Sequence, residues 1–230
     1  AVLKALGSEK KVADYVVDSS SKSTSKKDGA ISDSDLGLAP LRMSLESADW
    51  GNFSELSRAD YVVVHPGMGG SARNWPVDYY ANLIDALLPH SQVVVTGAPG
   101  DKDWVDPIKE ICGEKVGLHW LTLVEAKQWL TLIANAKALV VPSTGTAHVA
   151  ASLGVPTFGI YSPVRVQAPK RWAPLGPRVQ VFVPDVDCPA HLKCLFEECP
   201  RFDCMRDLAV QDIKNAVLGA LGIKENGSKP

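Results

Sequence analysis

The sequence predicts an α/β fold, a Rossmann-like doubly wound parallel sheet, from two features of its patterning. Short continuous apolar runs, such as the one from Ala59 to His65, have the composition of strands that are buried on both faces. Segments with the apolar spacing of helices separate these runs along the chain. Strands that alternate with helices of this length form parallel sheets, and the loops that follow the strands gather along one edge.

The first strand is expected at Ala59–His65, and a loop with three glycines in four residues follows it. A helix should begin near Val77, because Pro76 suits the first turn of a helix. The other elements continue the alternation. Further strands are expected at 92–96, 116–121, 138–141, 155–160 and 178–183. Further helices are expected at 101–112, at 122–137, between the turn at 143–146 and Gly154, and at 210–221.

Length, charge and hydropathy limit the class of protein. The chain has 230 residues, 46% of them hydrophobic, which is enough for a packed core. The net charge of -2 provides no basic field for nucleic acid or for an anionic membrane, so no nucleic-acid partner is expected. No apolar run approaches the roughly 18 residues of a membrane span. We therefore expect a soluble protein without a transmembrane segment.

Three parts of the chain differ in composition. Residues 1–57 are expected to be a partial domain or an interdomain remnant, with a flexible Ser- and Lys-rich loop at 18–29. Residues 58–222 are expected to form the Rossmann-like domain, and residues 223–230 a frayed tail. Because the chain begins at Ala1 rather than Met, we expect a processed form or a piece of a longer protein.

The stretch from Ala138 to Ile160 has the pattern of a strand, a tight turn, a helix and a second parallel strand. Ser143 and Thr144 are good N-cap residues, and Gly145 allows the backbone to come close to a ligand. Unpaired N–H groups at the positive end of the helix dipole would face the edge of the sheet where anions such as phosphate bind. His148, in the first helical turn, either donates to a phosphate oxygen or bonds a nearby loop carbonyl.

Two of the loops that follow strands carry cations. Arg73, in the first loop, has a forked set of donors suited to phosphate, and the alternative is a solvated arginine in a plain connection. The loop at 161–177 is long and proline-rich, and it contains three cations and one Trp. A loop of this length in a compact domain is typical of a binding or gating element.

Four of the five cysteines lie in one short segment, at Cys188, Cys194, Cys199 and Cys204. Their clustering suggests a metal site, yet no pair has the two-residue gap of a zinc knuckle or ribbon. The alternative is buried or free thiols that pack a helical loop, which we favour. Disulfides would be unexpected in a cytosolic protein.

Four pieces of the sequence, in this order, resemble glycosyltransferase family 9, the ADP-heptose:lipopolysaccharide heptosyltransferases. They are His65-Pro-Gly67 with Arg73-Asn-Trp-Pro76, Thr96-Gly-Ala-Pro-Gly100, Ser143-Thr-Gly-Thr-Ala-His148 followed by Leu153-Gly-Val-Pro156, and Tyr161-Ser-Pro163 with Arg171-Trp-Ala-Pro174 before Cys204-Met205. The resemblance extends over about residues 59 to 221. Ser143 stands where the family usually has Asp, and the first loop lacks the Lys that the family usually carries near Arg73.

This resemblance implies a GT-B architecture of two Rossmann-like domains, of which the chain is the carboxyl-terminal, nucleotide-sugar-binding one. It implies a donor diphosphate held by Gly67, Arg73, Ser143, Thr144, Gly145, Thr146, Ala147 and His148, with Thr96 and Gly97 in a further donor loop. Backbone dipoles and Arg73 would neutralise the departing diphosphate, so no metal cofactor is expected. The family's base, an Asp, belongs to the amino-terminal acceptor domain, so no catalytic residue is assigned here.

Two functions remain open at this point. In the first, the parent protein is a glycosyltransferase that transfers a sugar, from ADP-heptose, to a lipopolysaccharide core acceptor with inversion. Its partners would be a nucleotide-sugar donor and a lipid-linked saccharide acceptor, and it would be cytoplasmic, with peripheral association at the inner face of the inner membrane. In the second, the chain is a non-catalytic module that binds a nucleotide or nucleotide sugar, because its acceptor domain is absent or because Ser143 replaces an acidic residue.

Overall fold

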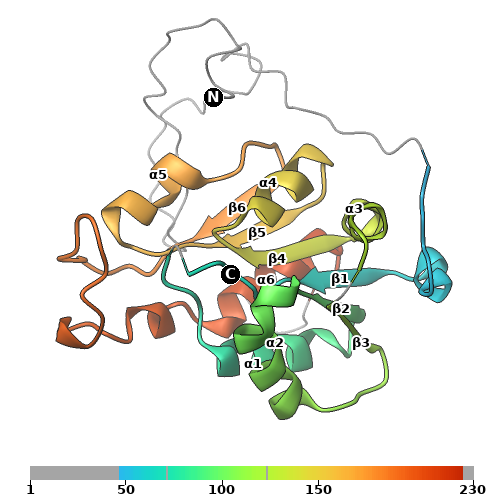
Figure 1. Cartoon of the computed structure of the whole chain (residues 1–230), viewed down its shortest axis with the longest axis horizontal. Helices are drawn as coiled ribbons and strands as arrows, with labels where there is room; N and C mark the ends of the chain where they lie inside the picture. The colour runs from blue at the N-terminus through green and yellow to red at the C-terminus, as the bar shows by residue number, and fades with distance from the viewer. Residues whose placement is uncertain (1–46, 71, 123, 225–230) are drawn as a thin grey trace, which may run out of the picture.

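The computed structural model describes residues 47–70, 72–122 and 124–224, and a six-stranded parallel sheet lies at its centre (Figure 1). The strands are β1 (Tyr61–Val64), β2 (Gln92–Thr96), β3 (Leu118–Leu121), β4 (Ala138–Pro142), β5 (Thr157–Ile160) and β6 (Val179–Phe182). They lie in the order β3-β2-β1-β4-β5-β6, and every pair of neighbours is parallel. The predicted α/β fold is confirmed.

Helices cover both faces of this sheet. They are α1 (Val77–Leu87), α2 (Lys102–Cys112), α3 (Ala126–Asn135), α4 (Gly145–Ser152), α5 (Pro169–Trp172) and α6 (Val210–Ala220). In Figure 1, α1, α2 and α6 lie on one face of the sheet, and α3 and α4 lie on the other. Among the described residues, no helix has the length and apolar content that crossing a membrane requires.

The face covered by α1, α2 and α6 carries a large hydrophobic cluster, and Trp75 is part of it. The Trp75 side chain is fully buried, and it meets the rings of Tyr79 and Tyr80 edge-on at centroid distances of 5.5 and 5.2 Å. Its indole N–H donates to the carbonyl of Leu208 at 3.1 Å. Trp75 therefore ties the start of α1 to the segment that leads into α6.

The opposite face packs the apolar side chains of α3 and α4 against the sheet. Residues before β1 join this cluster, because Leu56 is only 1% exposed and the amide of Asp49 donates to the hydroxyl of Thr131 on α3 at 3.0 Å. The packed unit therefore includes residues before 58, where the domain was expected to begin. Most of the expected remnant, residues 1–46, and of the expected tail, residues 225–230, lies outside the described residues.

Several predicted elements are longer than the observed ones, among them the strand expected at 155–160, which begins at Thr157, and the helix expected at 122–137, which begins at Ala126. Two of the differences have a clear local cause. The strand expected at 116–121 begins at Leu118, because Gly117 has a φ of +81° and the preceding Val116 is fully exposed. The helix expected to reach Lys137 ends at Asn135. Ala136 is extended, and the amide of Lys137 donates to the carbonyl of Tyr61 at 2.9 Å, so Lys137 already belongs to the sheet ladder.

The winding of the sheet reverses between the two central strands, β1 and β4. β2 and β3 extend the sheet on the far side of β1, and β5 and β6 extend it on the far side of β4. Val62 pairs with Ala138, and Val64 pairs with Val140, so the two strands end side by side. The loops that leave a pair of strands at such a reversal diverge to opposite faces, and the crevice between them is the usual ligand site of a doubly wound sheet.

We predict that Trp75→Phe lowers the free energy of unfolding by about 1–3 kcal/mol, because it removes volume from a packed cluster and leaves the Leu208 carbonyl without its donor. Urea unfolding followed by circular dichroism measures this loss. The matched control is Val116→Ala, at a fully exposed position, which should change stability by less than about 0.5 kcal/mol. Equal effects of the two substitutions would contradict the role given to Trp75.

Candidate functional site

A groove of about 560 Å³ opens at the reversal of the sheet, and we call it the switch-point groove. Three loops and the start of α4 form its walls. It is lined by Ala72 after β1, by Ser143, Thr144, Gly145 and His148 after β4, by Val166, Gln167, Arg171 and Trp172 after β5, and by Leu192. The predicted turn therefore lies where the crevice of a doubly wound sheet is expected.

The amino-terminal end of α4 carries unpaired donors, and Thr144 and Gly145 line this groove whereas Thr146 does not. Within the described part of the chain, the amides of Gly145 and Thr146 donate no hydrogen bond, whereas the Ala147 amide donates to the carbonyl of Thr144 at 3.2 Å. The hydroxyl of Thr144, the N-cap residue, is buried and also has no partner among the described residues. These donors lie at the positive end of the helix dipole and are available to an anion.

The backbone at Gly145 is open to the groove. A β-carbon built at this position would meet no atom within 4 Å. A ligand can therefore approach the Gly145 amide without displacing protein atoms, as the sequence predicted for a glycine at this turn.

Tyr161, directly after β5, supports the turn and the opposite wall together. It is fully buried, and its hydroxyl donates to the carbonyl of Trp172 at 2.9 Å. Burial raises the pKa of Tyr161 to about 12, and a hydrogen bond with Ser143 acts in the opposite direction. Tyr161 thus remains a neutral hydroxyl that contacts one residue on each side of the groove.

His148 also contacts the opposite wall. Burial lowers the pKa of His148, and a hydrogen bond to the backbone of Trp172 acts in the opposite direction. Of the two roles that the sequence left open for His148, the effect of the Trp172 backbone on its pKa favours the contact with a loop carbonyl. Because its ring also lines the groove, His148 remains within reach of a bound ligand.

The long loop after β5 contributes a cation and an aromatic ring to the groove. The guanidinium carbon of Arg171 lies 5.5 Å from the centroid of the Trp172 ring, which is 48% exposed. The indole N–H of Trp172 donates to the carbonyl of Val166 at 2.7 Å, which fixes the ring over the loop. The sequence marked this loop as a binding element but did not assign Arg171 or Trp172 to the site, although its cations and its Trp were the available signal.

The structure does not bring the side chain of Arg73 into the switch-point groove, which corrects the expectation that Arg73 faces the turn. Its Nη2 donates to the carbonyl of Phe202 at 2.7 Å, and its guanidinium carbon lies 4.8 and 5.5 Å from the ring centroids of Phe202 and Phe196. These partners belong to residues 183–209, which we call the cysteine-rich loop. Arg171, not Arg73, is the arginine that lines the groove.

Gly67, Thr96 and Gly97 do not line the groove. The hydroxyl of Thr96 lies 3.0 Å from Nδ1 of His65, and both residues are buried. A β-carbon on Gly67 would overlap the carboxylate of Asp101, and one on Gly97 would lie 2.8 Å from a methyl carbon of Val105. These glycines are therefore required by packing beneath the loops.

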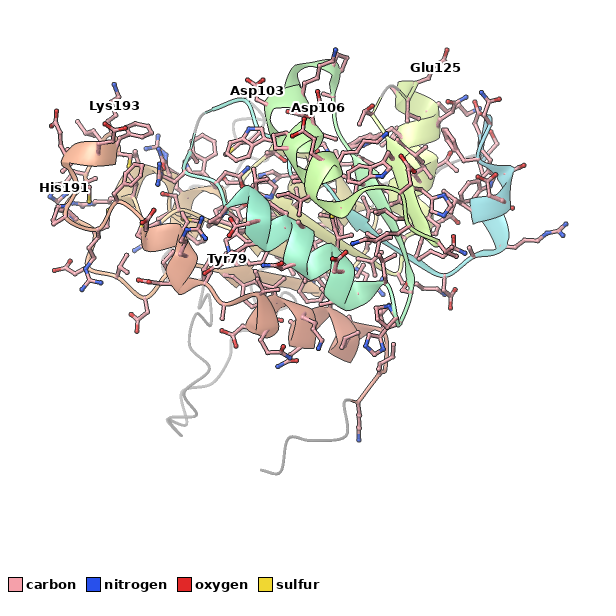
Figure 2. The ribbon with its side chains drawn as sticks, turned by 90° about the horizontal axis from the view of Figure 1, so that it is seen from below. Tyr79, Asp103, Asp106, Glu125, His191 and Lys193 are labelled. Carbon is pink, nitrogen blue, oxygen red and sulfur yellow. The ribbon has the colours of Figure 1, made fainter. Side chains whose placement is uncertain are left out.

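The four clustered cysteines do not line the groove, and together they line a second, small cavity. Burial raises the pKa of the Cys204 thiol, Arg73 acts in the opposite direction, and Cys188, Cys194 and Cys199 add to the rise. Among the described residues, no group of three His, Cys, Asp or Glu side chains is arranged to hold a metal ion as the structure stands. Figure 2 shows His191 and Lys193 at the outer end of the same loop, far from Glu125 at the start of α3.

Comparison with known proteins matches the chain to one protein family and to relatives of known name. A model of glycosyltransferase family 9 (heptosyltransferase) matches residues 8–199. Lipopolysaccharide heptosyltransferase 2 of Salmonella typhimurium is 30% identical over 135 residues, which cover 56% of this chain and 38% of that protein. The chain thus spans well under two thirds of the length of this relative.

Solved structures of heptosyltransferases have a similar fold. The Escherichia coli ADP-heptose lipopolysaccharide heptosyltransferase II is 24% identical, with a TM-score of 0.57 over 72% of this chain and 47% of that chain. The E. coli heptosyltransferase WaaC, solved with ADP, is 16% identical, with a TM-score of 0.55 over 82% of this chain and 53% of that chain. At these identities the likeness concerns the fold, and it extends over about half of each structure.

The buried His65 predicts a pH dependence of stability. Burial lowers the pKa of His65 from its usual 6.5 to about 4, and the charge of Asp101 acts in the opposite direction. In the unfolded chain His65 is protonated near pH 6.5, and in the folded chain only near pH 4. Neutral His65 therefore makes its full contribution to the free energy of unfolding above pH 6.5, and this contribution declines as the pH falls. Between pH 7.5 and 5, the free energy of unfolding should fall by about 2 kcal/mol through His65.

Urea unfolding of His65→Asn at the two pH values checks this linkage. The variant should lose most of that decline, whereas the matched control His90→Asn, at an exposed histidine, should keep it. An unchanged pH dependence in His65→Asn would show that another group is responsible.

Proposed function

Because the chain belongs to glycosyltransferase family 9, we propose that it supplies the donor-binding half of a heptosyltransferase. The whole protein would transfer a sugar, with ADP-heptose as the donor, to a lipopolysaccharide core acceptor and would invert the anomeric centre. The observation that carries this proposal is the switch-point groove, which Arg171 lines together with Gly145, whose amide donates no hydrogen bond within the described residues.

The donor diphosphate would bind at the amino-terminal end of α4. The amides of Gly145 and Thr146 and the hydroxyl of Thr144 offer hydrogen bonds to its oxygens, and they lack other partners among the described residues. Arg171 would add a fixed positive charge, and His148 a further donor from the same wall. Ala147, whose amide bonds the Thr144 carbonyl, would help to shape the helix terminus rather than bind the ligand directly.

This arrangement suits an inverting displacement. The acceptor hydroxyl attacks the anomeric carbon, the bond to the diphosphate breaks, and negative charge accumulates on the departing oxygens. Donors that are already fixed at the helix terminus stabilise this charge without reorganisation, and the cation of Arg171 adds to the effect. We therefore propose that the departing diphosphate needs no metal ion in this groove.

The catalytic base and the acceptor site would lie in the part of the protein that the relatives carry beyond the region matched here. A lipid-linked acceptor would place the protein at the cytoplasmic face of the inner membrane. The alternative, a module that binds nucleotide sugars without turnover, is favoured by one residue, Ser143, which lacks the charge of the Asp that the family usually carries there.

Calorimetric titration with ADP tests the assignment of the cation. Arg171→Ala should weaken ADP binding by about 1.5–3 kcal/mol, because it removes charged hydrogen bonds to the diphosphate. Arg73→Ala should change the affinity by less than about 0.5 kcal/mol, since its guanidinium contacts Phe202 instead. Lys170→Ala, on the same short helix but outside the groove lining, is the matched control. A larger loss in Arg73→Ala than in Arg171→Ala would reverse the assignment.

Transfer itself is tested with the protein expressed from its complete reading frame. Incubation with ADP-heptose and a truncated lipopolysaccharide should release ADP and lengthen the acceptor by one sugar, as mass spectrometry detects. ADP binding without sugar transfer would favour the binding module. Absence of both binding and transfer would contradict the two functions together.

A further inference from the structure

We propose that Cys188, Cys194, Cys199 and Cys204 form a tetrathiolate site for one thiophilic metal ion, zinc or iron, and that this ion fixes the cysteine-rich loop against the loop after β1. The site is separate from the switch-point groove, and its role is structural. It does not depend on the proposed function, since it concerns the loop and not the donor.

The first observation is convergence. The four cysteines are spread over a segment without regular strands, yet all four residues line one cavity of about 10 Å³. A volume of this size accommodates one water-sized particle. Four cysteine thiolates are the ligand set of structural zinc and of mononuclear iron, because soft thiolates select these metals.

The second observation is that the cysteine-rich loop has little else to hold it. Among the described elements, only two short 3₁₀ turns, Phe196–Glu198 and Cys204–Asp207, lie within residues 183–209. Four of its large apolar side chains are 40–81% exposed, namely Leu192, Leu195, Phe196 and Phe202. A long loop that buries so little apolar surface is expected to need a crosslink or a metal to adopt one conformation.

The third observation is a strained backbone turn whose amide donates a hydrogen bond to a cysteine sulfur. Phe196 has a φ of +48°, and no other non-glycine residue in the described part of the chain has a positive φ. This left-handed conformation directs the Phe196 amide to Sγ of Cys194 at 3.4 Å. Such strain persists where the surroundings demand it, and N–H donors to sulfur stabilise a thiolate that binds a metal.

The fourth observation is charge. A divalent ion with four thiolates carries a net charge of about −2, which nearby cations must compensate. Arg201 lines the cavity, and the guanidinium of Arg73 contacts the carbonyl of Phe202, two residues from Cys204. Nε of Arg73 is buried and has no hydrogen-bond partner among the described residues, so it is available to a sulfur of the cluster.

Metal binding requires a local rearrangement, because no three candidate ligands in the described residues already have the geometry of a metal site. The thiols would turn toward their common cavity, and each would release its proton to solvent as its sulfur bonds the ion. No electrons are transferred in this step. A structural ion of this kind would fix Leu192, which lines the switch-point groove, and Phe202, which holds Arg73.

Metal analysis of the full chain, purified without chelator under reducing conditions, tests the proposal. We expect about one zinc or iron per chain, and iron would also give a visible thiolate charge-transfer band. The double variant Cys199→Ser/Cys204→Ser should reduce the metal content at least tenfold. The matched control Cys112→Ser removes the cysteine that lies outside the cavity and should keep the metal.

A second measurement uses the wild-type protein, since a cysteine variant can fail to fold. Stepwise modification of thiols with an organomercurial, with a chromogenic chelator present, should release one metal ion as four thiols react. The melting temperature should fall on chelation and recover when zinc is added back. Wild-type protein with less than one metal ion per ten chains, or with the four cysteines paired as disulfides, would overturn the proposal. An unchanged metal content in the double variant Cys199→Ser/Cys204→Ser would also overturn the proposal.

Discussion

The parallel pairing of β1 with β4 is the constraint on which the rest of the structure depends. These two buried strands end side by side, so the loop after β1 and the turn after β4 must separate at one edge of the sheet. The short helix α4 starts directly in that turn, and its first amides have no intrahelical acceptors. The topology therefore leaves unpaired amides at this edge of the sheet, before any particular side chain is considered.

The two arginines that border this region have different tasks. Arg171 lies on a short helix in the groove, beside an exposed Trp172 that is fixed by its own hydrogen bond. The guanidinium of Arg73 lies over two phenylalanine rings and donates to a carbonyl of the cysteine-rich loop, and its charge lowers the pKa of the Cys204 thiol. The loop after β1 thus touches the groove through Ala72 and the cysteine-rich loop through Arg73, so the two regions are mechanically connected.

Much of the fold could be predicted from the sequence because buried parallel strands leave a local signature. The strand at Gln92–Thr96 was located to the residue and the helix start was expected near Val77, where it is observed, since the apolar pattern, Pro76 and the flanking loops agree there. The turn at Ser143–Gly145 was also located, because residue preferences at helix starts are local, although the Thr144 hydroxyl makes no capping hydrogen bond. The direction of the Arg73 side chain could not be predicted, since its partners Phe196 and Phe202 lie far along the chain. The convergence of the cysteines has the same long-range cause.

The central claim is that a donor diphosphate binds at the amino-terminal end of α4. Amide chemical shifts of the ¹⁵N-labelled protein during titration with ADP measure this contact residue by residue. The account predicts that the Gly145 and Thr146 amides undergo the largest changes, with the Trp172 indole N–H also affected, and that the cysteine-rich loop beyond Leu192 changes little. Saturable ADP binding that leaves the Gly145 and Thr146 amides unmoved would contradict it.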